Sequence, residues 1–134
     1  MPPALSICHT DSLGETIQRR FPNTRVVKAL NTMNARVMTD PARIPGQHNV
    51  FLSGNDADAK ARVAGWLSQW LGWPPADILD LGDITSARGA EMLLPVWLRL
   101  MLALGTPEFN VHVSRAPATA AAAGPEAGSP GRPT

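Results

Sequence analysis

Short apolar runs rich in β-branched residues alternate along this chain with segments of helical periodicity, a pattern typical of an α/β fold. These runs predict five strands, at residues 4–8, 25–30, 48–53, 77–81 and 109–113. Because helical segments separate the strands, we expect mostly parallel pairing, with helices packed on the faces of one sheet. The strand at 25–30, with its paired valines, is expected to be central and covered on both faces.

The segments between the first strands carry signals for helix starts and ends. Ser12 and Glu15 have the spacing of a capping box, which predicts a helix from there to about Phe21. Helical spacing over residues 33–38 predicts a short second helix. Proline and glycine in residues 41–46 should then hold the chain in a loop before the next strand.

The third helix should have Asn55 or Asp56 as its cap and Gly72 as its end. Apolar residues recur along it at three- and four-residue steps, so one stripe should be buried. The stripe consists of Ala59, Val63, Trp66, Leu67, Trp70 and Leu71. We expect its tryptophans, together with Trp73 and Trp97, to anchor the core and an interface rather than to form stacking platforms.

The last helix is predicted to open near Thr85, its expected cap, and to be apolar nearly all round between Met92 and Leu104. A helix without a solvent face implies a second buried surface, against another subunit or a missing part of the domain. We expect a homodimer through this helix. Binding to a membrane surface is disfavoured, because the helix lacks a lysine- or arginine-rich face.

The composition is that of a soluble protein with one hydrophobic core. Of the 134 residues, 44% are hydrophobic and 17% are charged, and 12 basic residues nearly balance 11 acidic ones. The basic residues are scattered, so no nucleic-acid partner is expected. We expect residues 1–114 to form the domain and residues 115–134, rich in Ala, Pro and Gly, to form a disordered tail.

Three features favour a cytoplasmic location. The single cysteine, Cys8, excludes an intrachain disulfide and a thiolate zinc site. The first residues, Met-Pro-Pro-Ala, lack the basic and apolar regions of a secretory signal. The longest apolar stretch falls short of the roughly 20 residues that span a bilayer, so no membrane association is expected.

Candidate chemistry lies in the turns that follow the strands. No phosphate-binding loop of the G-x-G-x-x-G or Walker type occurs in the sequence. In a parallel sheet, ligands gather where the strands end, so the polar turns at 9–10, 31–34, 54–56 and 82–83 could line one crevice. Asn, Asp, Thr and Gly are also ordinary turn residues, and we interpret 54–56 and 82–83 as helix starts.

The loop Asn31-Thr32-Met33-Asn34 is the strongest candidate for a binding site. Two asparagines and a threonine directly follow the strand that we expect to be central. His9 and Thr10, after the first strand, are candidates for the same crevice. We therefore expect a bound ligand to contact these two segments.

Covalent catalysis and metal binding have little support. The three histidines lie far apart in the sequence without metal-ligand spacing, so we expect no metal. Neither Ser12 nor Cys8 has the sequence context of a catalytic nucleophile, and we assign no catalytic residue.

Several motifs occur together in an order that one known family shares. They are Asp11-Ser-Leu-Gly-Glu15, Arg25-Val-Val-Lys-Ala-Leu-Asn-Thr-Met-Asn34, Val50-Phe-Leu-Ser-Gly-Asn-Asp-Ala-Asp58, Asp80-Leu-Gly-Asp83, Ala87-Arg-Gly-Ala-Glu91, Pro95-Val-Trp97 and Phe109-Asn-Val111. Together they resemble the NADPH-dependent coenzyme F-420 (deazaflavin) reductase family over nearly all of residues 5–113. A related domain forms the cytoplasmic part of the six-transmembrane metalloreductases.

The resemblance implies a Rossmann-like domain, often dimeric, that binds NADP(H) and passes hydride to or from a deazaflavin or flavin. The cofactors carry that chemistry, so the protein mainly positions two stacked rings and excludes water. The resemblance places the loop 31–34 near the nicotinamide and its redox partner. It also implies that this chain is the carboxyl-terminal half of such a domain and begins after the strand and glycine turn that hold the phosphates.

One position departs from the family pattern, because established deazaflavin reductases tend to have a histidine where this chain has Asn31. Our main hypothesis is a truncated NADP-dependent oxidoreductase that is inactive by itself. The alternative is a non-catalytic dimerisation or scaffold module, derived from such a domain, that keeps the apolar helix and has lost redox function.

Overall fold

The computed structural model describes residues 4–117, and within them three strands form one sheet in the order β1-β2-β3. The strands are β1 (Val27–Lys28), β2 (Val50–Gly54) and β3 (Ile78–Asp80). Strand β2 pairs antiparallel with β1 and parallel with β3, so the sheet is mixed. The predicted α/β class is confirmed. The strand at 25–30, however, is a short edge strand and not a central one.

The segments 4–8 and 109–113, for which we predicted strands, are irregular. A strand needs a continuous ladder of backbone hydrogen bonds to a neighbour. In segment 109–113, the Val111 carbonyl accepts one such bond from the Asn49 N–H at 2.9 Å, and the Val113 N–H is bound instead by the Asn49 side chain at 2.8 Å. The segment therefore lies beside the start of β2 without extending the sheet.

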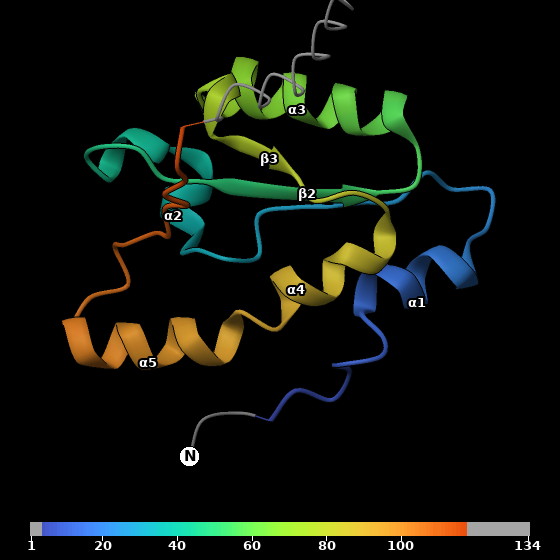
Figure 1. The fold of residues 1–134 in the computed structure, drawn as a ribbon, viewed down its shortest axis with the longest axis horizontal. Helices are drawn as coiled ribbons and strands as arrows, with labels where there is room; N and C mark the ends of the chain where they lie inside the picture. The colour runs from blue at the N-terminus through green and yellow to red at the C-terminus, as the bar shows by residue number, and fades with distance from the viewer. Residues whose placement is uncertain (1–3, 118–134) are drawn as a thin grey trace, which may run out of the picture.

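Five α-helices and three short 3₁₀ turns connect and cover the strands in the described part of the chain. The helices are α1 (Leu13–Arg20), α2 (Ala35–Thr39), α3 (Ala57–Leu71), α4 (Ala87–Glu91) and α5 (Leu94–Leu104). The 3₁₀ turns are η1 (Pro41–Arg43), η2 (Pro75–Asp77) and η3 (Ile84–Ser86). Figure 1 shows α3 along one side of the sheet and α1 with α4 on the other.

The predicted caps of α1 and α3 are confirmed. The Ser12 hydroxyl accepts the Glu15 N–H at 3.1 Å and donates to the Glu15 carboxylate at 2.7 Å. The Asp56 carboxylate accepts the Ala59 N–H at 2.7 Å, and Gly72 ends α3 in the left-handed conformation with φ of 81°.

The last helical segment differs from the single helix that we predicted. Asp83, rather than Thr85, caps its start, because the Asp83 carboxylate accepts the Thr85 N–H at 2.9 Å. The segment then divides into η3, α4 and α5. Pro95 lies in the first turn of α5, where it has no N–H to continue the hydrogen bonds of α4, so the helix breaks before it.

The core lies between α3, β2 and the segment that contains α2. Its buried members are Met33, Val37, Val50, Leu52, Leu67 and Trp73. Trp73 is only 1% exposed, and its indole N–H donates to the Met38 carbonyl at 3.0 Å. It therefore anchors the core, as predicted.

Trp66 and Trp70 do not anchor the core. Trp70 is 70% exposed, and the two indole rings stack on each other with centroids 5.5 Å apart. Each helical residue is rotated by roughly 100° from the next, so the burial of Leu67 turns Trp66 toward solvent.

The tail that we predicted at residues 115–134 lies mostly outside the described residues, since these end at residue 117.

Candidate functional site

The loop that follows β1 starts with an unusual backbone conformation. Leu30 has φ of 67°, in the left-handed region that few residues other than glycine adopt. Directly after it, the Asn31 side-chain Nδ2 donates to the Ala90 carbonyl at 2.9 Å, at the end of α4. The Asn31 Oδ1 is buried and has no hydrogen-bond partner. The sharp turn therefore leaves Asn31 with a free acceptor.

The other three residues of the predicted loop have different roles. Thr32 is 3% exposed, and its hydroxyl also has no partner. Met33 belongs to the core, and Asn34 caps α2 by accepting the Arg36 N–H at 2.9 Å. The loop thus offers two polar side chains, Asn31 and Thr32, for binding, while Met33 and Asn34 hold it in place.

His9 and Thr10 are exposed in a turn, and His9 also has a positive φ, of 62°. A cavity of about 300 Å³ lies beside Asn31, and the residues just before His9 contribute to its wall instead. Its lining consists of Leu5, Ser6, Ile7, Leu13, Lys28, Asn31, Glu91 and Leu94. The structure therefore brings the first segment to the loop, but through residues 5–7.

The single crevice predicted at the ends of the strands does not form. Strand β1 runs antiparallel to β2, whereas β3 runs parallel to it. The carboxyl end of β1 therefore lies beside the amino-terminal ends of β2 and β3, away from their carboxyl ends. The Arg25–Asp56 ion pair, at 3.3 Å, joins the start of β1 to the start of α3. The turns 54–56 and 82–83 are thereby separated from the loop 31–34.

Two further polar groups near the loop were not predicted as site residues. The Trp97 indole N–H and the Asn110 Oδ1 are buried without partners. Asn110 approaches the Met33 sulfur at 3.9 Å, and Trp97 stacks on Phe109 with centroids 5.4 Å apart. Two sequence signals marked this segment, namely the alternation of apolar and polar residues from Phe109 to Val113 and the family motif Phe109-Asn-Val111, but neither identified Asn110 as a site residue.

Buried polar groups are almost always hydrogen-bonded in proteins. Within residues 4–117, four buried side-chain atoms lack a partner, and they belong to Asn31, Thr32, Trp97 and Asn110. Asn110 contacts Met33, the neighbour of Thr32 in the chain, and Trp97 stacks on Phe109, the neighbour of Asn110. We therefore identify this region as the candidate site, since a bound polar group would supply the missing partners.

A carboxylate beside the cavity ties three elements together. The Glu91 side chain accepts the Leu13 and Gly14 N–H groups at 2.7 and 3.0 Å and pairs with Lys28 at 3.2 Å. A negative charge is favourable at a helix N-terminus, here that of α1. Glu91 therefore holds α1 and β1 against α4 and fixes the wall of the cavity.

A second ion pair supports the same arrangement. The Arg88 guanidinium hydrogen-bonds to the Glu15 carboxylate and lowers the pKa of Glu15 below its ordinary value, although burial acts in the opposite direction. The Ser12 hydroxyl adds to the effect. Glu15 is therefore ionised at neutral pH and serves as a structural anion.

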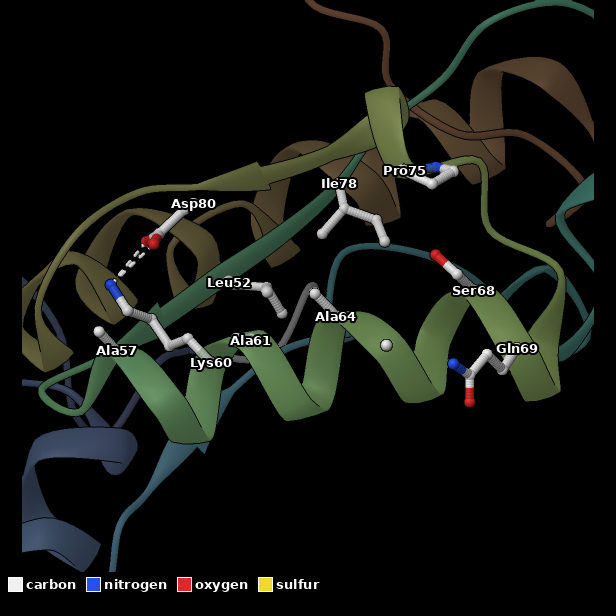
Figure 2. A pocket seen from close by; sticks show the side chains of 11 residues that line it. Leu52, Ala57, Lys60, Ala61, Ala64, Ser68, Gln69, Pro75, Ile78 and Asp80 are labelled. Atoms are coloured by element: carbon white, nitrogen blue, oxygen red, sulfur yellow. Dashed lines mark hydrogen bonds and ion pairs between the residues drawn. The ribbon is translucent and has the colours of Figure 1, made fainter.

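A separate groove lies between α3 and β3 (Figure 2), with a volume of about 480 Å³. Small side chains of one face of α3 line it, among them Ala57, Ala61 and Ala64. At one end, Lys60 pairs with Asp80 at 2.8 Å and donates to the Gly82 carbonyl at 3.0 Å. The groove contains none of the predicted site residues, and its apolar lining suits binding rather than chemistry.

Two other classes of site were also sought in the described residues. Over residues 4–117, no group of three or more His, Cys, Asp or Glu side chains could hold a metal ion. No helix in this same range is long and apolar enough to cross a membrane.

No family model and no curated protein matches the chain. Solved structures do match it. The chain is similar to a solved reductase. That protein, from Arthrobacter sp. FB24, is described as a candidate coenzyme F-420-dependent NADP reductase. The identity is 62%, the TM-score is 0.82, and the match covers 86% of this chain.

The same match covers 51% of the solved reductase, so this chain spans about half of that protein's length. The similarity supports the predicted family and the Rossmann-like interpretation of the fold. That this chain is the carboxyl-terminal half of such a domain stays a prediction, as does its relation to the six-transmembrane metalloreductases.

Proposed function

We propose that this chain carries the nicotinamide side of an NADP-dependent oxidoreductase, which transfers hydride between NADPH and a deazaflavin or flavin-type acceptor. The 62% identity to the Arthrobacter reductase is the observation that carries this proposal. At such identity over 86% of the chain, the residues around the loop 31–34 should have the same task in both proteins.

The polar groups of the loop fit a nicotinamide. Its carboxamide has N–H donors and a carbonyl acceptor, and the loop has a free acceptor on Asn31 and a free hydroxyl on Thr32. When bound, the nicotinamide supplies the hydride, and the ring chemistry belongs to the cofactor. The protein's part is to orient the ring with Asn31 and Thr32 and to exclude water with the apolar side chains around them.

The phosphates of NADPH need a different site. Backbone N–H groups of a glycine-rich turn usually bind the pyrophosphate, and the 134 residues contain no such turn. We infer that the phosphate site belongs to residues beyond this chain and that the chain alone binds NADPH weakly and is inactive. In this proposal, the chain is the carboxyl-terminal half of the complete domain.

The assembly is also part of the proposal. Helix α5 contains no buried residue and exposes several large apolar side chains, including Val96, Leu102 and Leu104. An exposed apolar helix of this kind is typical of an interface, so we propose a homodimer, in the cytoplasm, that pairs through residues 92–104. A dimerisation module without redox function is the second candidate, favoured by the same helix.

The test compares the 134-residue chain with a chimera that joins it to the amino-terminal half of the Arthrobacter reductase. We expect calorimetry to detect NADPH binding by the chimera and little or none by the chain alone. Thr32→Val in the chimera should weaken NADPH binding, whereas Ser68→Ala in the distant groove should not. A chimera that binds NADPH no better than the chain alone would favour the dimerisation module instead.

A further inference from the structure

The groove between α3 and β3 lies over a part of the sheet that α3 leaves uncovered. Helix α3 packs against β1 and β2, whereas β3 is an edge strand. Ile78 of β3 is therefore only half-buried, and Figure 2 shows its side chain pointing into the groove, where Leu52 of β2 and Ala64 of α3 also lie. The groove, of about 480 Å³, thus has one apolar wall from a helix and another from the edge of the sheet.

The shape of the groove suits a second helix beside α3. In α/β folds, helices pack on the faces of a sheet, and packed helices have axes about 8–10 Å apart. The middle of the α3 wall is formed by Ala61, Ala64 and Gly65, so a helix with equally small side chains can approach it closely. From Lys60 to Ser68 this wall extends over about 12 Å, at about 1.5 Å per residue. The groove therefore has room for roughly two turns of helix.

The described part of the chain ends beside one end of this groove. Arg115 lines a neighbouring cavity together with Ala76 and Asp77 of η2. Pro75, the first residue of the same turn, lines the groove itself. A segment that starts at residue 117 therefore has only to pass η2 to enter the groove.

The sequence that follows has the signals of a short helix. Residues 118–124 are Ala-Thr-Ala-Ala-Ala-Ala-Gly, and alanine has the highest helix propensity. Pro117 stands where proline favours the first turn of a helix, and Gly124 and Pro125 are typical of its end. A helix over residues 117–123 would be about 10 Å long, which matches the groove. A helix this short is not stable alone in water, so it needs a surface to pack on.

We propose that residues 117–123 fold as a helix in the groove between α3 and β3, so that the chain's own tail covers the edge strand. These residues carry no charged side chain, so no charge has to be desolvated in an apolar groove. Because the segment is attached beside the groove, its effective concentration there is on the order of millimolar, which favours it over a separate molecule. The prediction of a disordered tail then applies beyond residue 123. This inference does not depend on the proposed oxidoreductase function.

The first experiment compares the ¹⁵N amide spectrum of the 134-residue chain with that of a chain that ends at Pro117. We expect the backbone signals of Ala64 and Gly65, in the wall of the groove, to differ between the two chains. The signals of Gly46 and Gly105, which do not line the groove, should coincide. Groove signals that also coincide would overturn the proposal.

Two substitutions in the full-length chain repeat the comparison without shortening it. Ala121→Asp places a carboxylate in the middle of the proposed helix, and Ala127→Asp places the same group beyond its end. Ala121→Asp should give the groove signals of the shortened chain, whereas Ala127→Asp should keep those of the unaltered chain. Both variants leave residues 4–117 unchanged, so the domain should fold in each. Equal effects of the two substitutions would contradict docking of residues 117–123.

A third comparison alters the groove instead of the segment. A Cβ at Gly65 meets nothing within 4 Å, so Gly65→Leu fills the groove without disturbing α3, and Gly89→Leu is the matched control at an equally open position of α4. The amide protons of Ala122 and Ala123 should exchange roughly tenfold more slowly in the unaltered chain and in Gly89→Leu than in Gly65→Leu. Exchange that is equally fast in all three proteins would overturn the proposal.

Dilution distinguishes docking within one chain from docking between two copies. Docking within one chain does not depend on protein concentration, so the groove signals should stay in place over a tenfold dilution. Groove signals that move toward those of the shortened chain on dilution would show that the groove takes the tail of a second copy, and would overturn the proposal as stated.

Discussion

The Arg88 guanidinium binds the Glu15 carboxylate through two nitrogens, across 73 positions of the sequence. The Glu15 side chain is only 7% exposed, so its charge depends on this partner. We expect Arg88→Met to destabilise the fold more than Glu15→Gln, because it leaves a buried carboxylate without its cation. Urea unfolding of both variants measures the difference.

The control for this prediction is the more exposed pair Arg19–Asp11, at 2.6 Å. Surface ion pairs contribute little to stability, so Arg19→Met should change the urea midpoint less than Arg88→Met does. Equal losses from the two arginine variants would show that the Arg88 pair is no more important than a surface contact.

Acid should destabilise the protein through the same carboxylates. Arg88 holds the pKa of Glu15 below 4.5, and Arg19 lowers the pKa of Asp11 from 3.8 to about 2. Because these pKa values are depressed in the folded state, the stability they contribute is present above the ordinary values and is lost as the pH falls through and below them. Urea unfolding should give a free energy that decreases between about pH 5 and pH 2.

Arg88→Met provides the internal check on the acid prediction. Without the guanidinium, the pKa of Glu15 should return toward its ordinary value, so stability should depend less on pH below about 4.5. An unchanged pH dependence in this variant would assign the acid sensitivity to other groups.

Among Trp66, Trp70 and Trp73, replacement of Trp73 is expected to destabilise the fold most. Trp73→Ala removes a fully buried indole and its hydrogen bond to Met38, at a cost of about 3–5 kcal/mol. Trp70→Ala removes a largely exposed ring whose stacking on Trp66 contributes at most about 1.5 kcal/mol. In thermal unfolding, Trp73→Ala should therefore have a clearly lower melting temperature than Trp70→Ala. Similar melting temperatures would contradict the burial pattern.

Two glycines should respond to alanine in opposite directions. A Cβ at Gly54 would lie 2.9 Å from the Val26 carbonyl oxygen, so Gly54→Ala must push β1 and β2 apart, at a cost of about 1–3 kcal/mol. A Cβ at Gly65, within α3, meets nothing within 4 Å, and Gly65→Ala should stabilise the helix by about 0.5–1 kcal/mol. Chemical denaturation of both variants gives the two signs directly.

The proposed dimer makes α5 the most informative surface to alter. Leu102 is 69% exposed in the single chain, and Leu102→Asp should convert a dimer into a monomer in sedimentation experiments. Trp70→Ser changes a similarly exposed apolar residue on α3 and should leave the dimer intact. A monomeric unaltered chain, or a dimer that survives Leu102→Asp, would contradict pairing through α5.

Local signals in the sequence predicted the start of α1 and the start and end of α3, although the same kind of signal gave the wrong cap, Thr85, for the last helical segment. The capping box at Ser12 and the left-handed Gly72 are examples, because each depends on residues within a few positions. The loop 31–34 was predicted in the same way, as a polar run after an apolar one, and its role in binding stays a prediction. Two of its side chains, Asn31 and Thr32, have a buried polar atom without a hydrogen-bond partner.

Features that depend on distant parts of the chain were not predictable in this way. The antiparallel pairing of Lys28 with Ser53 separates the end of β1 from the ends of the other strands, and no local pattern encodes that direction. Asn110 belongs to the candidate site through its unpartnered Oδ1 and its approach to Met33, 77 positions earlier in the sequence. Hydrophobic alternation alone predicted a strand there.

The exposed indole pair of α3 gives this chain an optical signature. Trp66 and Trp70 lie parallel to within 7° at 5.5 Å, close enough for their electronic transitions to couple, so the pair should contribute its own band to the circular dichroism. Trp73, in the core, reports through its fluorescence on a different environment. One spectrometer could therefore follow the unwinding of α3 separately from the loss of the core, without any label.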